Sequence, residues 1–397
     1  MNIVNENVRQ TGINPLAVID RLIADSELTE TEYKDAATSY KAVASVLSKP
    51  ESKIQILNPD IFPQGSMRLG TTVRPIGSDH FDLDMVCWLN ASDKKCTPDQ
   101  LYNWVWETLG NDAAYRDRRQ KKNRCIRINY AEAKKFHLDV TPAIPDSTQA
   151  NGSLFVPDRE LKIWSPSHPI GFSDEWFKKA AEKMPQYELL KEAMVFANRA
   201  KIEELPEYGA FEKKPLQRIV QLLKRHRDHY FQENKKYRPT SILLTTLVTH
   251  SYLEAVKLPV KNLVEFIGNV LVGVPKYIVI SGYNGSQKYS VINPTTPSED
   301  FAENWTSENY SQFIKWHSKL IEWYKVSVQT KGQGFDKILN RLSESFGNES
   351  VIKAASALGA DTSVLHESGK LRVDKISGKI GAVGTAIRTT TFFGNGR

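Results

Sequence analysis

The sequence predicts an α+β fold, in which a mixed β-sheet with helices comes first and a helical domain follows. Two observations carry this prediction. Short runs of alternating or apolar residues, interrupted by turns, fill residues 54–165. Beyond residue 170 the apolar residues recur with the spacing of helices, and this pattern persists through most of the remaining chain.

The first elements can be placed from these periods. Apolar residues between Leu16 and Leu47 recur at helical spacing, which predicts one long helix over residues 15–47 that backs the sheet. Residues 101–110 read as a helix that stops at Gly110. The predicted strands and apolar runs cover residues 54–58, 81–89, 124–130, 136–144 and 154–158.

The later part of the chain is predicted to be helical and to end in a tail. The helical segments are residues 174–184, 187–200, 216–232, 242–256, 262–274 and 309–329. The last residues are rich in Gly and Thr and lack apolar periodicity, so residues 373–397 are expected to form a flexible tail.

The composition narrows the class of protein. The chain has 397 residues, of which 40% are hydrophobic and 25% charged, enough for a sizeable core and two subdomains. No apolar run is long enough to cross a membrane and no signal peptide is recognisable, so a cytoplasmic protein without membrane contact is expected. Three cysteines at unrelated spacings, Cys87, Cys96 and Cys125, indicate neither a disulfide framework nor a zinc site.

The formal net charge of +7 fits two kinds of partner. A positive field would serve nucleic-acid binding, and it would equally steer nucleoside triphosphates into an active site. Basic residues concentrate at 116–127, where a solvated hairpin tip is favoured over a nucleic-acid patch, and at 224–238. Charge alone leaves both interpretations open.

Three carboxylates have the arrangement that metal-assisted phosphoryl chemistry needs. Side chains at positions i and i+2 of a strand share a face, so Asp82 and Asp84 project together while the apolar residues that alternate with them project into the core. Asp139 lies on the polar side of a second strand and completes the triad. Oxygen ligands of this kind suit two Mg²⁺ ions, which Mn²⁺ can replace. His137 is expected to be a hydrogen-bonded neighbour of the triad instead of a ligand.

A Gly-Ser turn precedes the acidic pair. Gly65 lets main-chain N–H groups approach phosphates, Ser66 adds a hydroxyl donor, and Arg68 adds positive charge. Taken singly, a Gly-Ser pair is usually an ordinary turn and an Asp-x-Asp strand is usually a solvated face. Together with Asp139 they fit a polymerase-β-type nucleotidyltransferase, in which one ion activates a ribose hydroxyl and the other stabilises the leaving pyrophosphate.

Three stretches carry a resemblance to a known family. FPQGSMRLGTTVRPIGSDHFDLDMVCWL, FHLDVTPAIP and SPSHPIGFSDEWF are similar to the cGAS-like bacterial nucleotidyltransferases, the CD-NTase family of CBASS anti-phage signalling. The resemblance implies a polymerase-β-type nucleotidyltransferase mixed sheet followed by a helical (OAS/PAP-like) domain. It also implies template-independent synthesis of a cyclic di- or trinucleotide second messenger from ATP and a second nucleoside triphosphate.

The resemblance also implies roles for individual residues. Asp82, Asp84 and Asp139 match the catalytic, metal-binding positions of the family. The predicted nucleotide-binding residues are Gln64, Gly65, Ser66, Arg68, Lys224 and Ser241. For Lys224 a solvated lysine on a helix face is an equally weighted alternative. For Ser241 the alternative is simple helix capping by Thr240 or Ser241.

The regions and partners follow from the same comparison. We expect an N-terminal helical segment packing on the core (1–50), a nucleotidyltransferase core (51–205), a helical nucleotide-binding domain (206–372) and the tail (373–397). In some CD-NTase systems an E1/E2-like priming partner acts on the C-terminus, but such tails usually end in a small residue, whereas this one ends in Arg397. A cyclic-nucleotide-responsive effector is expected downstream. Without a zinc-bearing insertion, direct DNA binding is disfavoured.

Two other functions stay open beside the cyclic-oligonucleotide synthase. One is an enzyme that adds nucleotides to RNA or protein with the same metal site, and the other is a catalytically silent nucleic-acid-binding module. The intact acidic triad argues against the silent module. No interleaving of basic and aromatic residues stands out after residue 240, which disfavours the enzyme that extends RNA.

Overall fold

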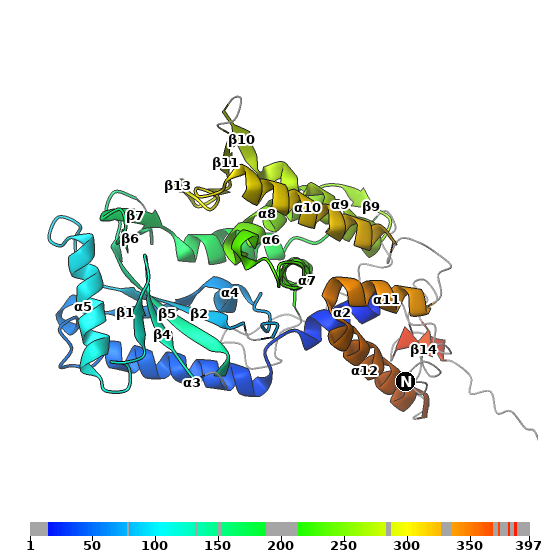
Figure 1. The fold of residues 1–397 in the computed structure, drawn as a ribbon, viewed down its shortest axis with the longest axis horizontal. Coiled ribbons are helices and arrows are strands. Elements are labelled where there is room, and N and C mark those ends of the chain that lie inside the picture. The colour runs from blue at the N-terminus through cyan, green and yellow to red at the C-terminus, as the bar shows by residue number, and fades with distance from the viewer. Residues whose placement is uncertain are drawn as a thin grey trace, which may run out of the picture. The chain divides into compact units, whose positions relative to one another are not determined.

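The computed structural model describes residues 15–77, 79–131, 134–149, 152–187, 213–282, 287–326, 335–367, 372–373, 380–381 and 385–386. The chain divides into two compact units. The first comprises Met1–Ser26, Tyr187–Arg199 and Ser318–Arg397, and the second comprises Glu27–Gln186 and Ala200–His317. All the predicted site residues belong to the second unit. Figure 1 shows the elements of both.

The second unit is built on a mixed sheet, of which the described residues form seven strands. The strands are β1 (Asp60–Gln64), β2 (Phe81–Trp88), β3 (Arg119–Lys121), β4 (Ile126–Asn129), β5 (Phe136–Pro145), β6 (Leu154–Asp158) and β7 (Ile163–Ser167). Their order is β1-β2-β5-β4-β3, with β6 paired to the end of β5 and β7 paired to β6. β2 and β5 run parallel, and the other pairs run antiparallel.

Two helices cover the apolar face of this sheet. α3 (Glu30–Leu47) and α5 (Pro98–Asn111) each begin at a capping box, in which Thr29 or Thr97 and the side chain three residues later satisfy the first main-chain N–H groups. Their buried residues and the alternate apolar residues of β2, β4 and β5 form one hydrophobic core. The opposite face of β2 and β5 is therefore free to carry polar side chains.

Short helical turns and helices complete the second unit. They are α4 (Gly65–Leu69), a π-helical turn (Gly171–Phe177), α6 (Lys178–Ala181), α7 (Pro215–Tyr230), α8 (Ser241–Ala255), α9 (Leu263–Gly273) and the first part of α10 (Ser307–Tyr324). Short strands that the sequence did not predict lie between α9 and α10. They are β10 (Val279–Ser281), β11 (Lys288–Ser290), β12 (Ile292–Asn293) and β13 (Thr296–Asp300). A mixed sheet followed by helices confirms the predicted α+β class.

The first unit is helical over most of its described residues. It contains α2 (Pro15–Asp25), which contacts α12 (Asn348–Glu367), and α11 (Phe335–Phe346), which also packs on α12. Three two-residue strands follow, namely β14 (Arg372–Val373), β15 (Ile380–Gly381) and β16 (Thr385–Ala386). No helix within the described ranges of the chain is long and apolar enough to span a membrane.

Several predicted boundaries differ from the structure. The single helix predicted over residues 15–47 is two helices, because Thr29 caps the start of α3 and ends the continuous helical run. Residues 54–58 were predicted to be a strand but contain the 3-10 turn Gln55–Leu57. Gly110 lies inside α5 instead of after it. Residues 188–200 and most of the predicted tail lie outside the described residues, and the predicted division into four regions stays a prediction.

Candidate active site

The candidate catalytic carboxylates come from two neighbouring parallel strands. In the pairing of β2 with β5, Asp84 lies opposite Asp139, and Asp82 lies opposite His137. Residues that alternate with them, such as Leu83, belong to the hydrophobic core on the other face of the sheet. The structure therefore brings the three predicted carboxylates to one face of the sheet.

Loss of hydration and neighbouring negative charge disfavour ionisation of the two carboxylates of β2. Burial, followed by the charges of Asp82 and Asp139, raises the pKa of Asp84 to about 8. Loss of hydration and the charge of Asp139 also raise the pKa of Asp82, although 53% of the Asp82 side chain is exposed. A cation placed among these groups would stabilise their ionised forms.

The Gly-Ser turn lies directly against the acidic pair. Gln64, the last residue of β1, lies opposite Asp84, and Gly65 follows it with a φ of +63°. A Cβ atom at Gly65 would lie 2.2 Å from Oδ2 of Asp84, so both the backbone conformation and the contact require glycine. The hydroxyl of Ser66 accepts a hydrogen bond from Oγ1 of Thr72 at 3.1 Å.

Two predicted nucleotide-binding side chains have partners within the protein. Nε2 of Gln64 donates a hydrogen bond to Oγ1 of Thr141 at 3.1 Å. Nε of Arg68 donates to Oγ of Ser173 at 2.6 Å, and Nη2 of Arg68 forms an ion pair with Asp174. Because Ser173 and Asp174 both lie in the π-helical turn, the guanidinium of Arg68 connects α4 to this turn.

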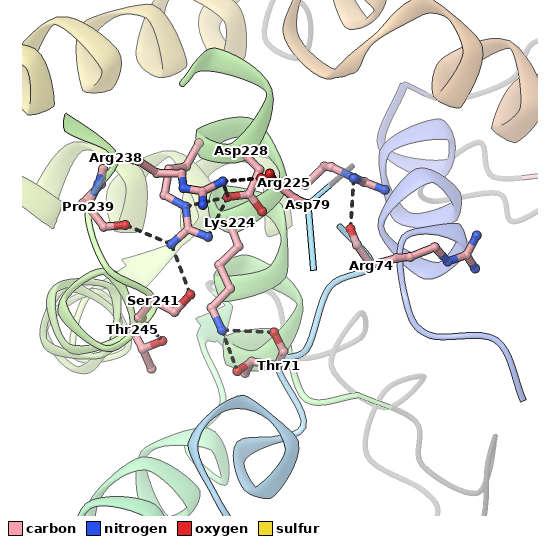
Figure 2. Close-up of polar contacts among 11 residues, drawn as sticks. Thr71, Arg74, Asp79, Lys224, Arg225, Asp228, Arg238, Pro239, Ser241 and Thr245 are labelled. Carbon is pink, nitrogen blue, oxygen red and sulfur yellow. Dashed lines mark hydrogen bonds and ion pairs between the residues drawn. The ribbon is translucent and has the colours of Figure 1, made fainter. Parts of the chain in front are cut away.

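Helix α7 holds the segment between the Gly-Ser turn and the acidic pair, and Figure 2 shows part of this contact. Side chains of α7 donate to main-chain carbonyl groups of that segment, namely Gln217 to Leu69, Gln221 to Thr72, Lys224 to Thr71 and Arg225 to Arg74. The donors recur every three or four residues, which places most of them along one side of the helix. Since residues 71–75 form no helix or strand, these bonds satisfy main-chain groups that would otherwise lack partners.

Lys224 is buried and is not a solvated lysine. Only 2% of the residue is exposed, and Nζ donates to the main-chain oxygen and to Oγ1 of Thr71 at 3.2 and 3.1 Å (Figure 2). Burial, followed by the positive charge of Arg227, lowers the pKa of Lys224 to about 7, whereas the charges of Asp228 and Asp84 oppose this shift. Lys224 thus supports the loop before the acidic pair and interacts electrostatically with Asp84.

Ser241 lies at the first position of α8. Thr240 caps this helix by accepting a hydrogen bond from the main-chain N–H of Leu243, so the capping alternative applies to Thr240. The hydroxyl of Ser241 instead accepts a hydrogen bond from Nη1 of Arg227 at 3.2 Å. Ser241 is therefore linked to α7, the helix that carries Lys224, and not directly to the carboxylates.

Arg127 is a site residue that the sequence analysis missed. It lies on β4 opposite Asp139. Its Nε donates to Oδ1 of Asp139 at 2.8 Å, and its Nη2 donates to Oδ2 of Asp139 at 2.7 Å and to Oδ1 of Asp82 at 2.9 Å. The expectation of a solvated hairpin tip at 116–127 is wrong for this residue. Its alternation with the buried Ile126 and Ile128 was the signal that places it on the face of the carboxylates.

The arrangement around Arg127 differs from a preformed metal cage. In the part of the chain that the structure describes, no group of three His, Cys, Asp or Glu side chains converges as such a cage. His137 lies opposite Asp82 with its ring centroid 4.5 Å from that of His80, but the expected hydrogen bond is not formed at its buried Nδ1, which has no partner among the described residues. Burial and the charge of Arg127 lower the pKa of His137, which favours its neutral form.

Comparisons with known proteins point to one family. Residues 17–180 match the model of the Second Messenger Oligonucleotide or Dinucleotide Synthetase (SMODS) domain. The c-di-GMP synthase of Roseivirga ehrenbergii is 32% identical over 336 residues, which cover 84% of this chain and 84% of that protein. The cyclic dinucleotide synthase CdnG of Bradyrhizobium diazoefficiens is 25% identical over 312 residues, or 75% of this chain and 71% of that protein.

The fold agrees with the sequence comparison. The structure of the CD-NTase CdnG of Bradyrhizobium diazoefficiens in complex with GTP superimposes with a TM-score of 0.63 at 20% identity. This alignment covers 86% of the present chain and 98% of that one.

Proposed function

We propose that Asp82, Asp84 and Asp139 form the catalytic centre of this chain, which belongs to the CD-NTase family of second messenger oligonucleotide or dinucleotide synthetases. The chain is a nucleotidyltransferase that makes cyclic oligonucleotides. The observation that carries the proposed centre is the parallel pairing of β2 with β5, which gathers the three carboxylates next to the Gly-Ser turn.

The carboxylates fit divalent metal ions, on which this family generally depends. All three are hard oxygen donors, and the raised pKa of Asp84 reflects first its burial and then the negative charge of Asp82 and Asp139, which a cation would compensate. We propose two Mg²⁺ ions, replaceable by Mn²⁺, held by Asp82, Asp84 and Asp139. When bound, such ions favour ionisation of an attacking hydroxyl and stabilise the charge of a leaving pyrophosphate.

The remaining residues position the substrates. The main chain at Gly65 and the hydroxyl of Ser66 would bind phosphate oxygens beside Asp84, because glycine lets the main chain approach that carboxylate closely. Lys224 fixes Thr71 and thereby the shape of the turn. Asp139 would assist deprotonation of the ribose hydroxyl that attacks the α-phosphate of a second nucleotide. Contacts of Gln64, Arg68 and Ser241 with nucleotide stay predictions, because each side chain now has a partner within the protein.

We further propose that GTP is one substrate, with ATP as the second nucleotide to be tested. A relative with 32% identity over 84% of the chain is named a c-di-GMP synthase, which favours a cyclic dinucleotide that contains guanine. The product would act as a second messenger of CBASS anti-phage defence through a cyclic-nucleotide-responsive effector.

Incubation with four radiolabelled nucleoside triphosphates and Mg²⁺ or Mn²⁺ tests this function. We expect a phosphatase-resistant cyclic product, identified by mass spectrometry. The Asp82→Ala/Asp84→Ala double variant should lose at least about 1,000-fold of product formation, since two of the three ligands are removed. Asp35→Ala, at an exposed site of α3, is the control and should keep full activity. Lengthened RNA or labelled protein would favour the alternative transferase, and product from the double variant would overturn the site.

A further inference from the structure

Arg127 occupies the position that a cation would take between two of the three carboxylates. Three hydrogen bonds of 2.7 to 2.9 Å join its guanidinium to both oxygens of Asp139 and to one oxygen of Asp82. No side-chain donor among the described residues bonds to Asp84. The positive charge of Arg127 is therefore shared by the two carboxylates that flank Asp84.

A divalent ion and Arg127 would compete for the same oxygen atoms. Both oxygens of Asp139 accept hydrogen bonds from Arg127, so an ion ligated by Asp139 would lie next to a guanidinium of like charge. When all three carboxylates are ionised, they carry a net charge of about −2 together with the guanidinium and about −3 without it. Removal of Arg127 would thus leave both more free oxygen atoms and more negative charge for the ion.

The side chain of Arg127 can leave without a change in the sheet. β4 is held to β3 and β5 by main-chain pairing, which does not involve the guanidinium. About a fifth of the Arg127 side chain, 22%, is exposed, and 53% of the Asp82 side chain is exposed. Rotation about side-chain bonds is therefore enough to uncover the two carboxylates.

We propose that Arg127 is the internal counter-ion of the carboxylate centre, and that a divalent ion binds Asp82 and Asp139 only when the guanidinium moves away from them. This inference rests on the proposed metal site. Arg127 is then a positioning residue that lowers the affinity for metal in the absence of nucleotide. Its charge becomes available to an anionic substrate once the ion has replaced it.

The test is a titration of the full chain with Mn²⁺ in the absence of nucleotide. Electron paramagnetic resonance of the free ion measures how much Mn²⁺ is bound. We expect Arg127→Gln to bind Mn²⁺ at least about tenfold more tightly than the wild type, which corresponds to about 1.4 kcal/mol. Arg127→Lys should give an intermediate affinity, because an ammonium keeps the charge but not the two-pronged contact with Asp139. The control is Arg118→Gln, which removes one exposed positive charge elsewhere and should leave the affinity within about twofold of the wild type.

Thermal melting supplies a second readout that does not depend on activity. Without metal, Arg127→Gln should melt below the wild type, because its carboxylates repel one another, and Mn²⁺ should raise its melting temperature by more than it raises that of the wild type. Equal or weaker binding of Mn²⁺ by Arg127→Gln would overturn the role of Arg127 and leave the metal site standing. Failure of both proteins to bind millimolar Mn²⁺ would overturn the metal site itself.

Discussion

Replacement of Asp84 by asparagine should stabilise the protein when no divalent ion is present. The folded chain holds the pKa of Asp84 at about 8 instead of its ordinary value of 3.8, so at pH 7 the folded state binds a proton that the unfolded state lacks. This difference costs at most about 4 kcal/mol of unfolding free energy at pH 7. Residual solvent contact of the side chain screens the charge, so we expect asparagine to recover about 1–3 kcal/mol.

The pH dependence of this gain is its most specific property. A carboxyl group whose pKa is raised on folding costs nothing below pH 4, costs progressively more up to about pH 8, and costs a constant amount above that. Urea unfolding of wild type and Asp84→Asn in EDTA should therefore give curves that coincide near pH 4 and diverge towards pH 8. Asp35→Asn, at an exposed site of α3, is the control and should show no such divergence. A difference between wild type and Asp84→Asn that does not change between pH 5 and pH 8 would refute the reasoning.

Three further outcomes test the supports of the site. Gly65→Ala should abolish most product formation and lower the free energy of unfolding by about 1–2 kcal/mol. The φ of residue 65 is +63°, and a Cβ atom there would contact Asp84. Wild-type activity of this variant would contradict the close approach of Gly65 to Asp84. Gln221→Ala should cost about 1–3 kcal/mol in urea unfolding, because its buried amide bonds the main chain of the loop, whereas the exposed Gln120→Ala should cost little. A double-mutant cycle between Arg68 and Asp174 should give a coupling of about 1 kcal/mol, and zero coupling would remove the tie between α4 and the π-helical turn.

A feature could be predicted from the sequence when the residues that determine it are close together in the chain. The shared face of Asp82 and Asp84 follows from strand alternation within five residues, so the sequence was sufficient. The prediction of one long helix over residues 15–47 was wrong because the apolar spacing continues across the break that the capping residue Thr29 makes. Periodicity reports which face of an element is buried but not where a cap interrupts it.

The role of Arg127 depended on a contact that is distant in sequence. Its pairing with Asp139 requires the register of β4 against β5, and its contact with Asp82 requires β2 to lie on the other side of β5. Neither register is encoded in a short motif. Lys224 was uncertain for the same reason, because its burial against Thr71 depends on the way α7 packs beside a loop some 150 positions earlier.

The distribution of positive charge around the carboxylates indicates where the first cation would bind. Arg127 compensates Asp82 and Asp139 through hydrogen bonds, whereas Lys224 acts on Asp84 only through space, because its ammonium is bonded to Thr71. Asp84 is thus the carboxylate with the least compensated charge, and it is also the one that contacts Gly65. A cation that arrives with a phosphate at the Gly-Ser turn would meet Asp84 first, without displacing Arg127. The raised pKa of Asp84 and the hydrogen bonds of Arg127 therefore belong to one arrangement, in which Arg127 neutralises Asp82 and Asp139 while no cationic side chain among the described residues bonds to Asp84 at the turn.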